Sequence, residues 1–406
     1  MGQTAPGNDG NVVMASTQPG AEVRRRPRDR KQQIVAAATT LFRRYGYGNV
    51  STGDIAQKVG ITPGALYRHF PSKQDILGQA IDSVVDDVLT PVAPADGDLD
   101  DVVGALSRSL AKRRDLGVLW HRECRHLEHK HRRRVQLRLQ GLLDRTAVDL
   151  AALRPDLTPE DAYLLAVFMV STLTSPSYHA AELPPEQETD LLQCCASAVA
   201  TTPLLAGSEH SPAHPARVGI SHLSRREGIV AAATRLFFER GYQATTVDDV
   251  GAAVGVSGAA VYKHFGSKSE LLAATISRAA EPLQLGMATA LSEAQTAHEA
   301  LTRALDEYIA FATVHHHLVG ILVSEATNLP DTMRHTVRRQ QATYVAEWVR
   351  LLRESRPELD AAQARYIVHA VLTTINDATR TDRIRAYPDL AQRLRQIGVR
   401  LLGVEL

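Results

Sequence analysis

Two short segments of the chain combine hydrogen-bond donors with small residues and aromatic rings. Residues 60–73 read GITPGALYRHFPSK, and residues 255–268 read GVSGAAVYKHFGSK. A tyrosine hydroxyl, a guanidinium or an ammonium group can donate to phosphate oxygens, and small residues let a backbone approach its partner closely. These residue types are suited to binding an anionic partner.

The chain shows no recognisable catalytic pattern. It has no serine-centred nucleophile elbow, no glycine loop that cradles phosphates and no motif of paired catalytic carboxylates. We therefore expect no catalytic residues and no cofactor. An enzyme is the competing class of protein, and the lack of these motifs disfavours it.

The composition requires any binding of a polyanion to come from local clusters of charge. The 406 residues include 46 Lys and Arg against 45 Asp and Glu, a net charge of +1 that predicts no such partner for the chain as a whole. The length predicts two or three domains, and abundant Ala and Leu with only 5% aromatic residues favour helices. Three cysteines, Cys124, Cys194 and Cys195, are too few for a disulfide framework, which indicates a reducing compartment.

Neither a membrane span nor a secretion signal is visible in the sequence. No apolar run reaches the roughly 18 residues needed to cross a bilayer. The longest candidate, residues 162–173, is expected to be a buried helix, and residues 1–21 lack the apolar centre of a secretory signal. We therefore expect a cytoplasmic protein with no membrane partner.

The sequence contains the same unit twice. Residues 34–77 align without a gap to residues 229–272 at an offset of 195, with about 20 identities over 44 positions. The chain is therefore predicted to be a fused duplicate of a unit of roughly 180 to 190 residues, joined by a linker rich in Gly, Ser and Pro at 206–216. A second match at an offset of 202 pairs Leu116 with Leu318, Glu123 with Glu325, Leu127 with Leu329, and Arg154-Pro155 with Arg356-Pro357.

The apolar pattern within each copy is helical. Five apolar residues between Ile34 and Phe42 fall on one face of a helix, and no segment sustains the period of two that is typical of strands. The fold class is therefore predicted to be all-α. Further helices are expected near 72–89, 100–113, 116–127, 130–153, 158–174 and 186–202 in the first copy, and near 267–280, 293–314, 318–327, 331–355, 360–378 and 388–403 in the second.

Helix caps precede both donor-rich segments. Residues 51–54 and 246–249 place a hydroxyl three residues before a carboxylate, the capping box that opens a short helix. The glycine at the start of each donor-rich segment can end that helix, and the hydroxyl two residues later, Thr62 or Ser257, can cap another. Two short helices around such a turn form a helix-turn-helix, whose second helix enters the major groove of DNA, although helical hairpins with these caps also occur in bundles.

The donor-rich segments, together with the LF-x-x-x-G-Y pattern at 41–47 and 236–242, resemble the DNA-binding region of TetR/AcrR-family transcriptional regulators. The resemblance covers about 50 residues in each copy. It implies two units, each with a three-helix, helix-turn-helix DNA-binding head on a larger helical domain that usually binds a small molecule and dimerises through its last two long helices. We therefore expect a repressor that a small apolar or amphipathic ligand releases from double-stranded DNA.

These observations predict six consecutive segments. Head 1 with body 1 is called unit 1 below, and head 2 with body 2 is called unit 2; each head is a DNA-binding domain and each body a helical regulatory domain. The expected segments are a disordered tail (1–23), head 1 (24–82), body 1 (83–205), a linker (206–221), head 2 (222–280) and body 2 (281–406).

The resemblance also implies which residues contact DNA. The small residues would let the second helix approach thymine methyl groups, the tyrosines would donate to phosphate, and Arg68 and Lys263 are the strongest candidates for base or phosphate contacts. Lys73 and Lys268 are expected to face the phosphate backbone, and the two histidines have a purely structural role as their alternative. Four apolar residues are expected to pack inside the heads: Leu66, Phe70, Val261 and Phe265. The expected contacts are Thr52, Thr62, Pro63, Gly64, Ala65, Tyr67, Arg68, His69 and Lys73 in head 1, and Ser257, Gly258, Ala259, Ala260, Tyr262, Lys263, His264 and Lys268 in head 2.

The two heads are not expected to bind DNA equally. Arg24, Arg25 and Arg26, at the start of head 1, form a basic arm that can follow the minor groove, although a solvated charge run is the alternative. Head 2 has fewer basic residues before it and carries Asp248 where head 1 has Gly53. We therefore expect head 1 to contribute more to affinity and to its salt dependence.

The difference in sequence between the two heads of one chain predicts how the two units assemble. Two-fold DNA sites are normally matched by two identical subunits. We expect an intramolecular pseudo-dimer that reads an asymmetric operator, with residues 157–173 and 186–203 packed on residues 359–377 and 388–402. The alternatives are a homodimer of tandem chains with four heads, and a ligand- or partner-binding protein with weakened DNA heads.

The bodies give weaker indications of ligand and metal sites. Candidate ligand contacts are Trp120, Glu123, Phe168, Glu325 and Tyr344, although both glutamates favour pairing with a nearby arginine. Cysteine and histidines at 121–131 and three consecutive histidines at 315–317 could hold zinc. The second copy lacks the ligands of the first cluster, and consecutive histidines point to different helix faces, so no metal site is expected.

Overall fold

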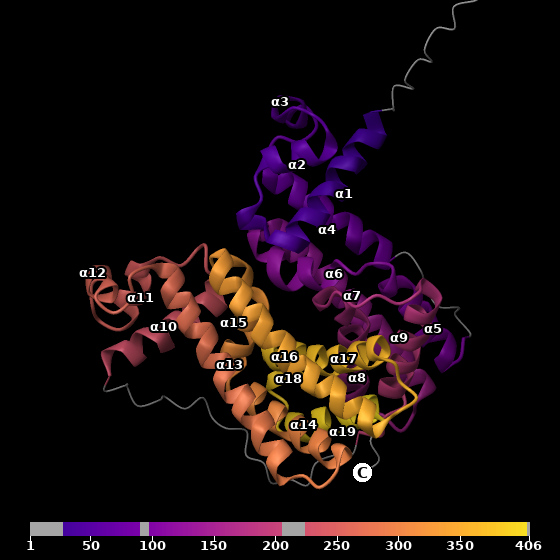
Figure 1. Ribbon diagram of the computed structural model, residues 1–406. Helices are drawn as coiled ribbons and strands as arrows, with labels where there is room; N and C mark the ends of the chain where they lie inside the picture. The colour runs from indigo at the N-terminus through magenta and orange to yellow at the C-terminus, as the bar shows by residue number, and fades with distance from the viewer. Residues whose placement is uncertain (1–26, 90–96, 205–223, 404–406) are drawn as a thin grey trace, which may run out of the picture.

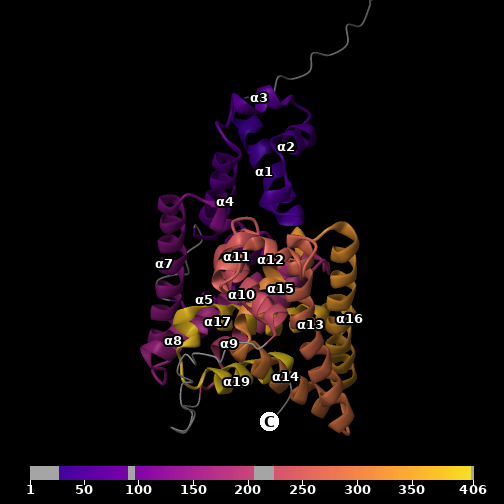
Figure 2. The same cartoon turned by 90° about the vertical axis from the view of Figure 1, so that its left-hand side faces the viewer.

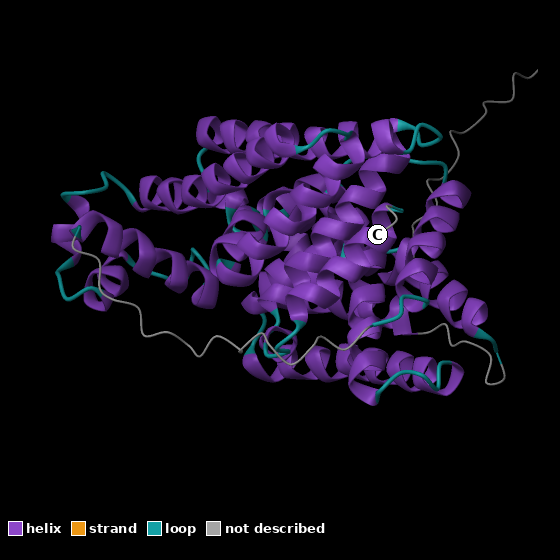
Figure 3. Cartoon of the chain, turned by 90° about the horizontal axis from the view of Figure 1, so that it is seen from below, coloured by secondary structure: helices purple, strands orange, loops and turns teal. Residues whose placement is uncertain are grey.

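The computed structural model describes residues 27–89, 97–204 and 224–403. These residues form helices joined by loops, and none of them lies in a strand (Figure 3), so the all-α prediction is confirmed. No helix within these three ranges is long and apolar enough to span a membrane.

The two units repeat the same order of elements (Figure 1). Unit 1 comprises α1 (Pro27–Tyr45), η1 (Tyr47–Asn49), α2 (Thr52–Val59), α3 (Pro63–Tyr67), α4 (Lys73–Leu89), α5 (Leu99–Ala111), α6 (Leu116–Val118), η2 (Leu119–Glu123), η3 (Cys124–His126), α7 (His129–Leu153), α8 (Pro159–Thr174), η4 (Ser175–Tyr178) and α9 (Pro185–Ala200). Unit 2 comprises α10 (Arg225–Arg240), α11 (Val247–Ala253), α12 (Gly258–Tyr262), α13 (Lys268–Glu293), α14 (Ala297–Val314), α15 (His316–Ser324), η5 (Ala326–Asn328), α16 (Asp331–Ser355), α17 (Ala361–Arg380), α18 (Asp382–Arg385) and α19 (Leu390–Leu402).

Several helices differ from the sequence prediction. The helix expected near 318–327 is divided into α15 and η5. The helix expected near 267–280 continues as α13 to Glu293 and contains Pro282. A proline inside a helix costs about 3 kcal/mol, but Leu283, Met287 and Ala290 continue the apolar face and are buried, and this burial offsets the cost. The helix expected near 116–127 is instead divided into α6, the π-helical turn η2 and the 3-10 turn η3.

Each head is a small bundle closed by apolar residues from its three helices. In head 1, Phe42 of α1, Ile55 of α2 and Leu66 of α3 are fully buried in one cluster. The capping boxes predicted before α2 and α11 are present, and each cap residue accepts a hydrogen bond from the backbone N–H three residues later. The helix-turn-helix therefore forms in both heads as its sequence predicts.

The two bodies pack against each other along their last long helices. α8 packs along α17, and α9 packs against α19, so that one apolar core runs through both bodies and into head 1. Head 2 has a separate core around Phe237, which also includes Ile321 of α15. At the contact between α8 and α17, the hydroxyls of Thr172 and Thr374 are 3.1 Å apart. These threonines are equivalent at the offset of 202, and residues that meet their own equivalents lie at the axis of a two-fold interface.

Polar contacts at the edge of this interface fix how the bodies sit on each other. Arg393 of α19 forms an ion pair with Asp161 of α8, and both side chains are largely buried. On the other side, Arg114 Nη2 donates to Tyr366 Oη at 3.0 Å. The two heads extend from neighbouring points of this paired body, with α3 at the top and α12 at the left of Figure 1, and Figure 2 shows α12 from its own side.

A pair of histidines lies in the contact between the units. The rings of His179 and His369 are 4.6 Å apart, and His179 meets the edge of Tyr366 at 4.4 Å. Burial, His369, and the charges of Arg114 and Arg365 lower the pKa of His179 to about 2. Burial and Arg365 lower the pKa of His369 to about 4. Both rings are therefore neutral in the folded protein near pH 7.

We expect acid to destabilise this contact. In the unfolded chain a histidine takes up a proton near its ordinary pKa of about 6.5, so the destabilisation begins as the pH falls below that value and grows to about 2 kcal/mol per histidine at pH 5. Urea denaturation at pH 7.5 and pH 5 measures it, with His179→Gln as the comparison. The loss of stability at pH 5 should be smaller by about 2 kcal/mol in the variant, and an unchanged pH dependence would contradict this account.

Candidate nucleic-acid interface and the head bases

The second helix of each helix-turn-helix is a single short turn held by its cap. The Thr62 hydroxyl accepts from Ala65 N at 3.2 Å, and the Ser257 hydroxyl accepts from Ala260 N at 3.3 Å. The four apolar residues expected inside the heads are buried, at 0–3% exposure: Leu66, Phe70, Val261 and Phe265. This anchoring turns the opposite face of α3 and α12 toward solvent.

Most of the expected DNA contacts share that outward face. Tyr67 is 51% exposed and Tyr262 is 53% exposed, so neither tyrosine belongs to a core. Ala65, His69 and Ala260 are half-buried beside them. The exposed members are Thr62, Pro63, Gly64, Tyr67 and Arg68 in head 1, and Ser257, Ala259, Tyr262, Lys263 and His264 in head 2.

The two faces differ in how their tyrosine is held. Tyr67 Oη lies 3.2 Å from Thr52 Oγ1, at hydrogen-bonding distance, which orients the hydroxyl of head 1. The residue equivalent to Thr52 in head 2 is Val247, which is buried and carries no hydroxyl. Tyr262 therefore lacks this support.

The structure does not support the expected phosphate contacts of the two lysines. Lys73 Nζ donates to Tyr47 O and Val50 O, both at 2.7 Å, and lies 4.0 Å from the centre of the Tyr47 ring. Lys268 Nζ lies 4.2 Å from the centre of the Tyr242 ring. Burial lowers the pKa of both lysines. Lys73 is thus directed into its head, toward the carbonyl groups of Tyr47 and Val50.

Gly258 also differs from the prediction that it contacts DNA. It is buried rather than facing outward, and a Cβ atom at this position would collide with the Asp248 carboxylate. At the offset of 195, the equivalents of Gly258 and Asp248 in head 1 are Pro63 and Gly53, neither of which carries a charge. Asp248 therefore adds a negative charge beside the start of α12 that head 1 does not have. Arg24, Arg25 and Arg26 lie outside the described residues.

A buried glutamate joins each head to its body. Glu123 and Glu325 are both 1% exposed, and their Oε2 atoms accept from Tyr47 N at 3.0 Å and Tyr242 N at 3.4 Å. Glu123 forms an ion pair with Arg122, and Glu325 forms one with Arg125 at 2.5 Å. These glutamates were candidate ligand contacts, but the structure places each at the base of its head, which we define as the contact between the glutamate and the residues that follow the first helix of the head.

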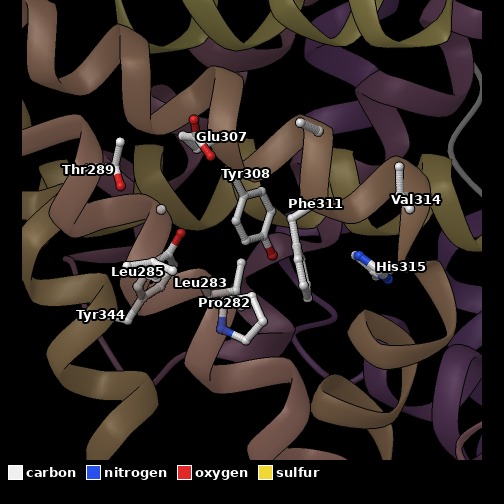
Figure 4. A pocket seen from close by; sticks show the side chains of 12 residues that line it. Pro282, Leu283, Leu285, Thr289, Glu307, Tyr308, Phe311, Val314, His315 and Tyr344 are labelled. Carbon is white, nitrogen blue, oxygen red and sulfur yellow. The ribbon is translucent and has the colours of Figure 1, made fainter. Parts of the chain in front are cut away.

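The bodies contain cavities that differ between the units. In body 2, α13, α14 and α16 surround a cavity of about 370 Å³, into which Tyr308, Phe311 and Pro282 project (Figure 4). In unit 1, a cavity of about 480 Å³ lies beside α7 and α8. Trp120 lines the cavity of unit 1 and Tyr344 that of unit 2, whereas Phe168 is fully buried in the core.

The histidine and cysteine clusters are used in packing. Cys124 is buried, and burial raises the pKa of its thiol to about 12. His126 stacks on Tyr47 with ring centres 4.9 Å apart. In the part of the chain that the structure describes, no group of three His, Cys, Asp or Glu side chains could hold a metal ion.

The comparison with known proteins identifies the heads. Residues 34–80 and 229–275 each match the family described as bacterial regulatory proteins, tetR family. Both matches coincide with the helix-turn-helix segments described above, so each of the two heads matches the TetR family.

Curated relatives match limited stretches of the chain. The activator FasR of Mycolicibacterium smegmatis is 33% identical over 87 residues, which cover 21% of this chain and 40% of FasR. The regulator Mb3439c of Mycobacterium bovis is 32% identical over 108 residues, covering 26% of this chain and 55% of the relative. The matches therefore span about half or less of these relatives.

Two solved structures each cover less than half of this chain. PfmR of Thermus thermophilus, at 27% identity and a TM-score of 0.39, covers 46% of this chain and 100% of its own. KstR2 of Mycobacterium tuberculosis, at 26% identity and a TM-score of 0.38, covers 46% of this chain and 97% of its own.

The internal placement of Lys73 predicts a stability role. Lys73→Met removes the donor to two part-buried carbonyl groups and should lower the free energy of unfolding by about 1–3 kcal/mol. Lys58→Met is the matched control, since Lys58 is an exposed lysine of the same head and should change stability by less than about 0.5 kcal/mol. Urea denaturation compares the two, and equal effects would refute the role.

Proposed function

We propose that the protein is a DNA-binding transcriptional regulator in which one chain reads two unlike half-sites of an operator. The observation that carries this proposal is the pair of outward donor faces on α3 and α12, centred on exposed Tyr67 and Tyr262. FasR, HbdR and Mb3439c are named as a transcriptional activator or regulators, which supports the same role, whereas other matched relatives are named nucleoid occlusion factors.

Each face has the chemistry that a major groove requires. The exposed tyrosine hydroxyl and the cation next to it, Arg68 or Lys263, can donate to phosphate oxygens or base acceptors. The small residues at the helix start bring the backbone close to the bases. Because the faces differ in sequence, TPGALYRH against SGAAVYKH, the two half-sites should differ as well.

Head 1 is proposed to supply more of the affinity. Its tyrosine is supported by Thr52, and three arginines precede it in the sequence. In head 2, Asp248 lies beside the start of α12 and opposes an approaching phosphate. This charge is also the one feature that favours the alternative of a partner-binding protein with weakened heads.

One chain is proposed to act as an intramolecular pseudo-dimer. The packing of α8 and α9 on α17 and α19 supports it, as does the contact between the equivalent residues Thr172 and Thr374. Surfaces already paired within the chain are not free to pair with another copy, which disfavours a homodimer with four heads.

Repression relieved by a ligand is the proposed mechanism. The cavities of the bodies offer sites with both apolar and polar walls for a small molecule. A ligand that binds one arrangement of the heads more tightly than another shifts the population toward it. The affinity for DNA then changes without any covalent chemistry.

Binding to the DNA upstream of the protein's own gene, measured at several salt concentrations, tests the head assignment. Replacing Arg24, Arg25 and Arg26 together by alanine should lower affinity and reduce the slope of log K against log salt by about two to three. Lys263→Ala should reduce the slope by about one. A larger loss from Lys263→Ala would overturn the ranking, and absence of binding by the unaltered chain would favour the partner-binding alternative.

The mass of the free protein in solution tests the assembly. The pseudo-dimer predicts 44.3 kDa, the mass of one chain. Light scattering across a range of concentrations measures it. A species of twice this mass at low micromolar concentration would instead support the homodimer with four heads.

A further inference from the structure

The cavity of unit 1 is closed by residues of unit 2. One wall carries Trp120, Leu139 and Val170 of unit 1. The facing wall includes Phe238, which belongs to α10, the first helix of head 2, and Gly320 of α15. A Cβ atom at position 320 would collide with the Phe238 ring, so α10 lies directly on α15 at this point. Whatever occupies the cavity therefore touches the base of head 2.

Arg125 connects the same cavity to the joint of head 2. It lines the cavity, and its Nη1 atom lies 2.5 Å from Glu325 Oε1. Glu325 in turn accepts from Tyr242 N, immediately after the end of α10. Gly241, with φ of +85°, ends that helix, and a Cβ atom there would lie 2.8 Å from Arg125 Nη1. The guanidinium of unit 1 thus fills the space beside the joint between α10 and its body.

The equivalent contact in unit 1, where Glu123 meets the residues after α1, has a different arginine partner. Glu123 takes its arginine from its own unit, because Arg122 pairs with it and also donates to Phe42 O and Arg43 O at 2.7 and 2.8 Å. At the offset of 202, Ser324 stands in the place of Arg122. Unit 2 therefore lacks this arginine, and Glu325 uses the one that unit 1 supplies.

The cross-unit contacts at the two heads differ in charge. In the direction of head 1, the cross-unit hydrogen bond is neutral, from Asn49 Nδ2 to Thr327 O at 3.1 Å. The charges near it are of like sign, because burial and the charges of Arg334, Arg122 and Arg44 lower the pKa of Arg338 of unit 2. In the direction of head 2 the cross-unit contact is an ion pair with a carboxylate that is 1% exposed. Removing the partner of a buried charge is strongly destabilising, whereas a partly exposed neutral hydrogen bond contributes little.

We propose that the cavity of unit 1 is a control site for head 2 and takes an anionic amphiphile, an apolar body with one acidic group. The apolar wall holds the body, and Arg125 receives the acidic group. Asp377 in the same cavity already has Arg380 and His121 as partners, so it does not compete for Arg125. An anion on Arg125 competes with Glu325 and loosens the joint after α10. The inference deepens the proposed ligand control and rests on it only in treating head 2 as a DNA head.

Hydrogen exchange on the full chain without DNA tests the proposal, with 8-anilinonaphthalene-1-sulfonate as the anionic amphiphile. The probe should speed exchange of the amides around Tyr242 by about tenfold and leave those around Tyr47 within twofold. Energy transfer from tryptophan to the probe should fall in Trp120→Phe, because Trp120 lines this cavity and Trp348 does not. No transfer, transfer that is undiminished in Trp120→Phe, or equal exchange in both heads would overturn the proposal.

Two variants, one for each buried glutamate, distinguish the contact at head 2 from the contact at head 1. Arg125→Met should speed exchange around Tyr242 by about tenfold without the probe, and the probe should then add less than twofold. Arg122→Met should act on the amides around Tyr47 instead. Unchanged protection in α8 and α17 shows that each variant is folded. If Arg125→Met leaves head 2 unchanged, the cross-unit joint is refuted, and because no DNA is present, this outcome is distinct from a failure to bind an operator.

Discussion

The packing of α8 and α9 on α17 and α19 determines where every other part of the molecule lies. Burial of this apolar surface pairs the two bodies, and the hydrogen bond between Thr172 and Thr374 places equivalent positions together. The head bases then meet, so that side chains of unit 1 reach the joint of head 2. Without the body contact, neither the relative placement of α3 and α12 nor the ion pair of Arg125 with Glu325 could exist.

Fusion of two units on one chain relaxes the constraint that an ordinary two-fold dimer imposes. In a dimer of identical subunits a substitution appears on both sides of the interface, whereas here each side can change alone. Two changes are of this kind: unit 2 has Ser324 at the position equivalent to Arg122, and Asp248 at the position equivalent to Gly53. The first makes the joint of head 2 depend on unit 1, and the second makes the charge beside the two DNA-facing helices unequal.

Local features of the fold could be predicted from the sequence because they depend on neighbouring residues. The capping boxes and the turn after α2 are set within four residues, which is why both helix-turn-helix motifs form as expected. The length of α13 could not be predicted this way, since burial of Leu283 and Met287 against other helices outweighs Pro282.

The sequence predicted correctly those site residues whose exposure depends on residue type alone. It failed for residues whose orientation depends on a partner that is distant in the sequence. Leu66 is buried and Tyr67 exposed as expected, but Lys73 donates to the carbonyl groups of Tyr47 and Val50, which lie more than twenty residues away in the sequence. Arg125 and Glu325 are separated by 200 positions, so no local pattern joins them. The one indication in the sequence was the alignment of the two copies, in which Arg122 is replaced by Ser324 in the second copy.

The central claim is that one chain occupies one operator through both heads. The mass of the complex formed with an operator duplex, measured together with the footprint of the protein on that duplex, tests this claim most directly. The account predicts one chain per duplex and two protected half-sites of different sequence. Two chains per duplex, or protection of a single half-site, would contradict it.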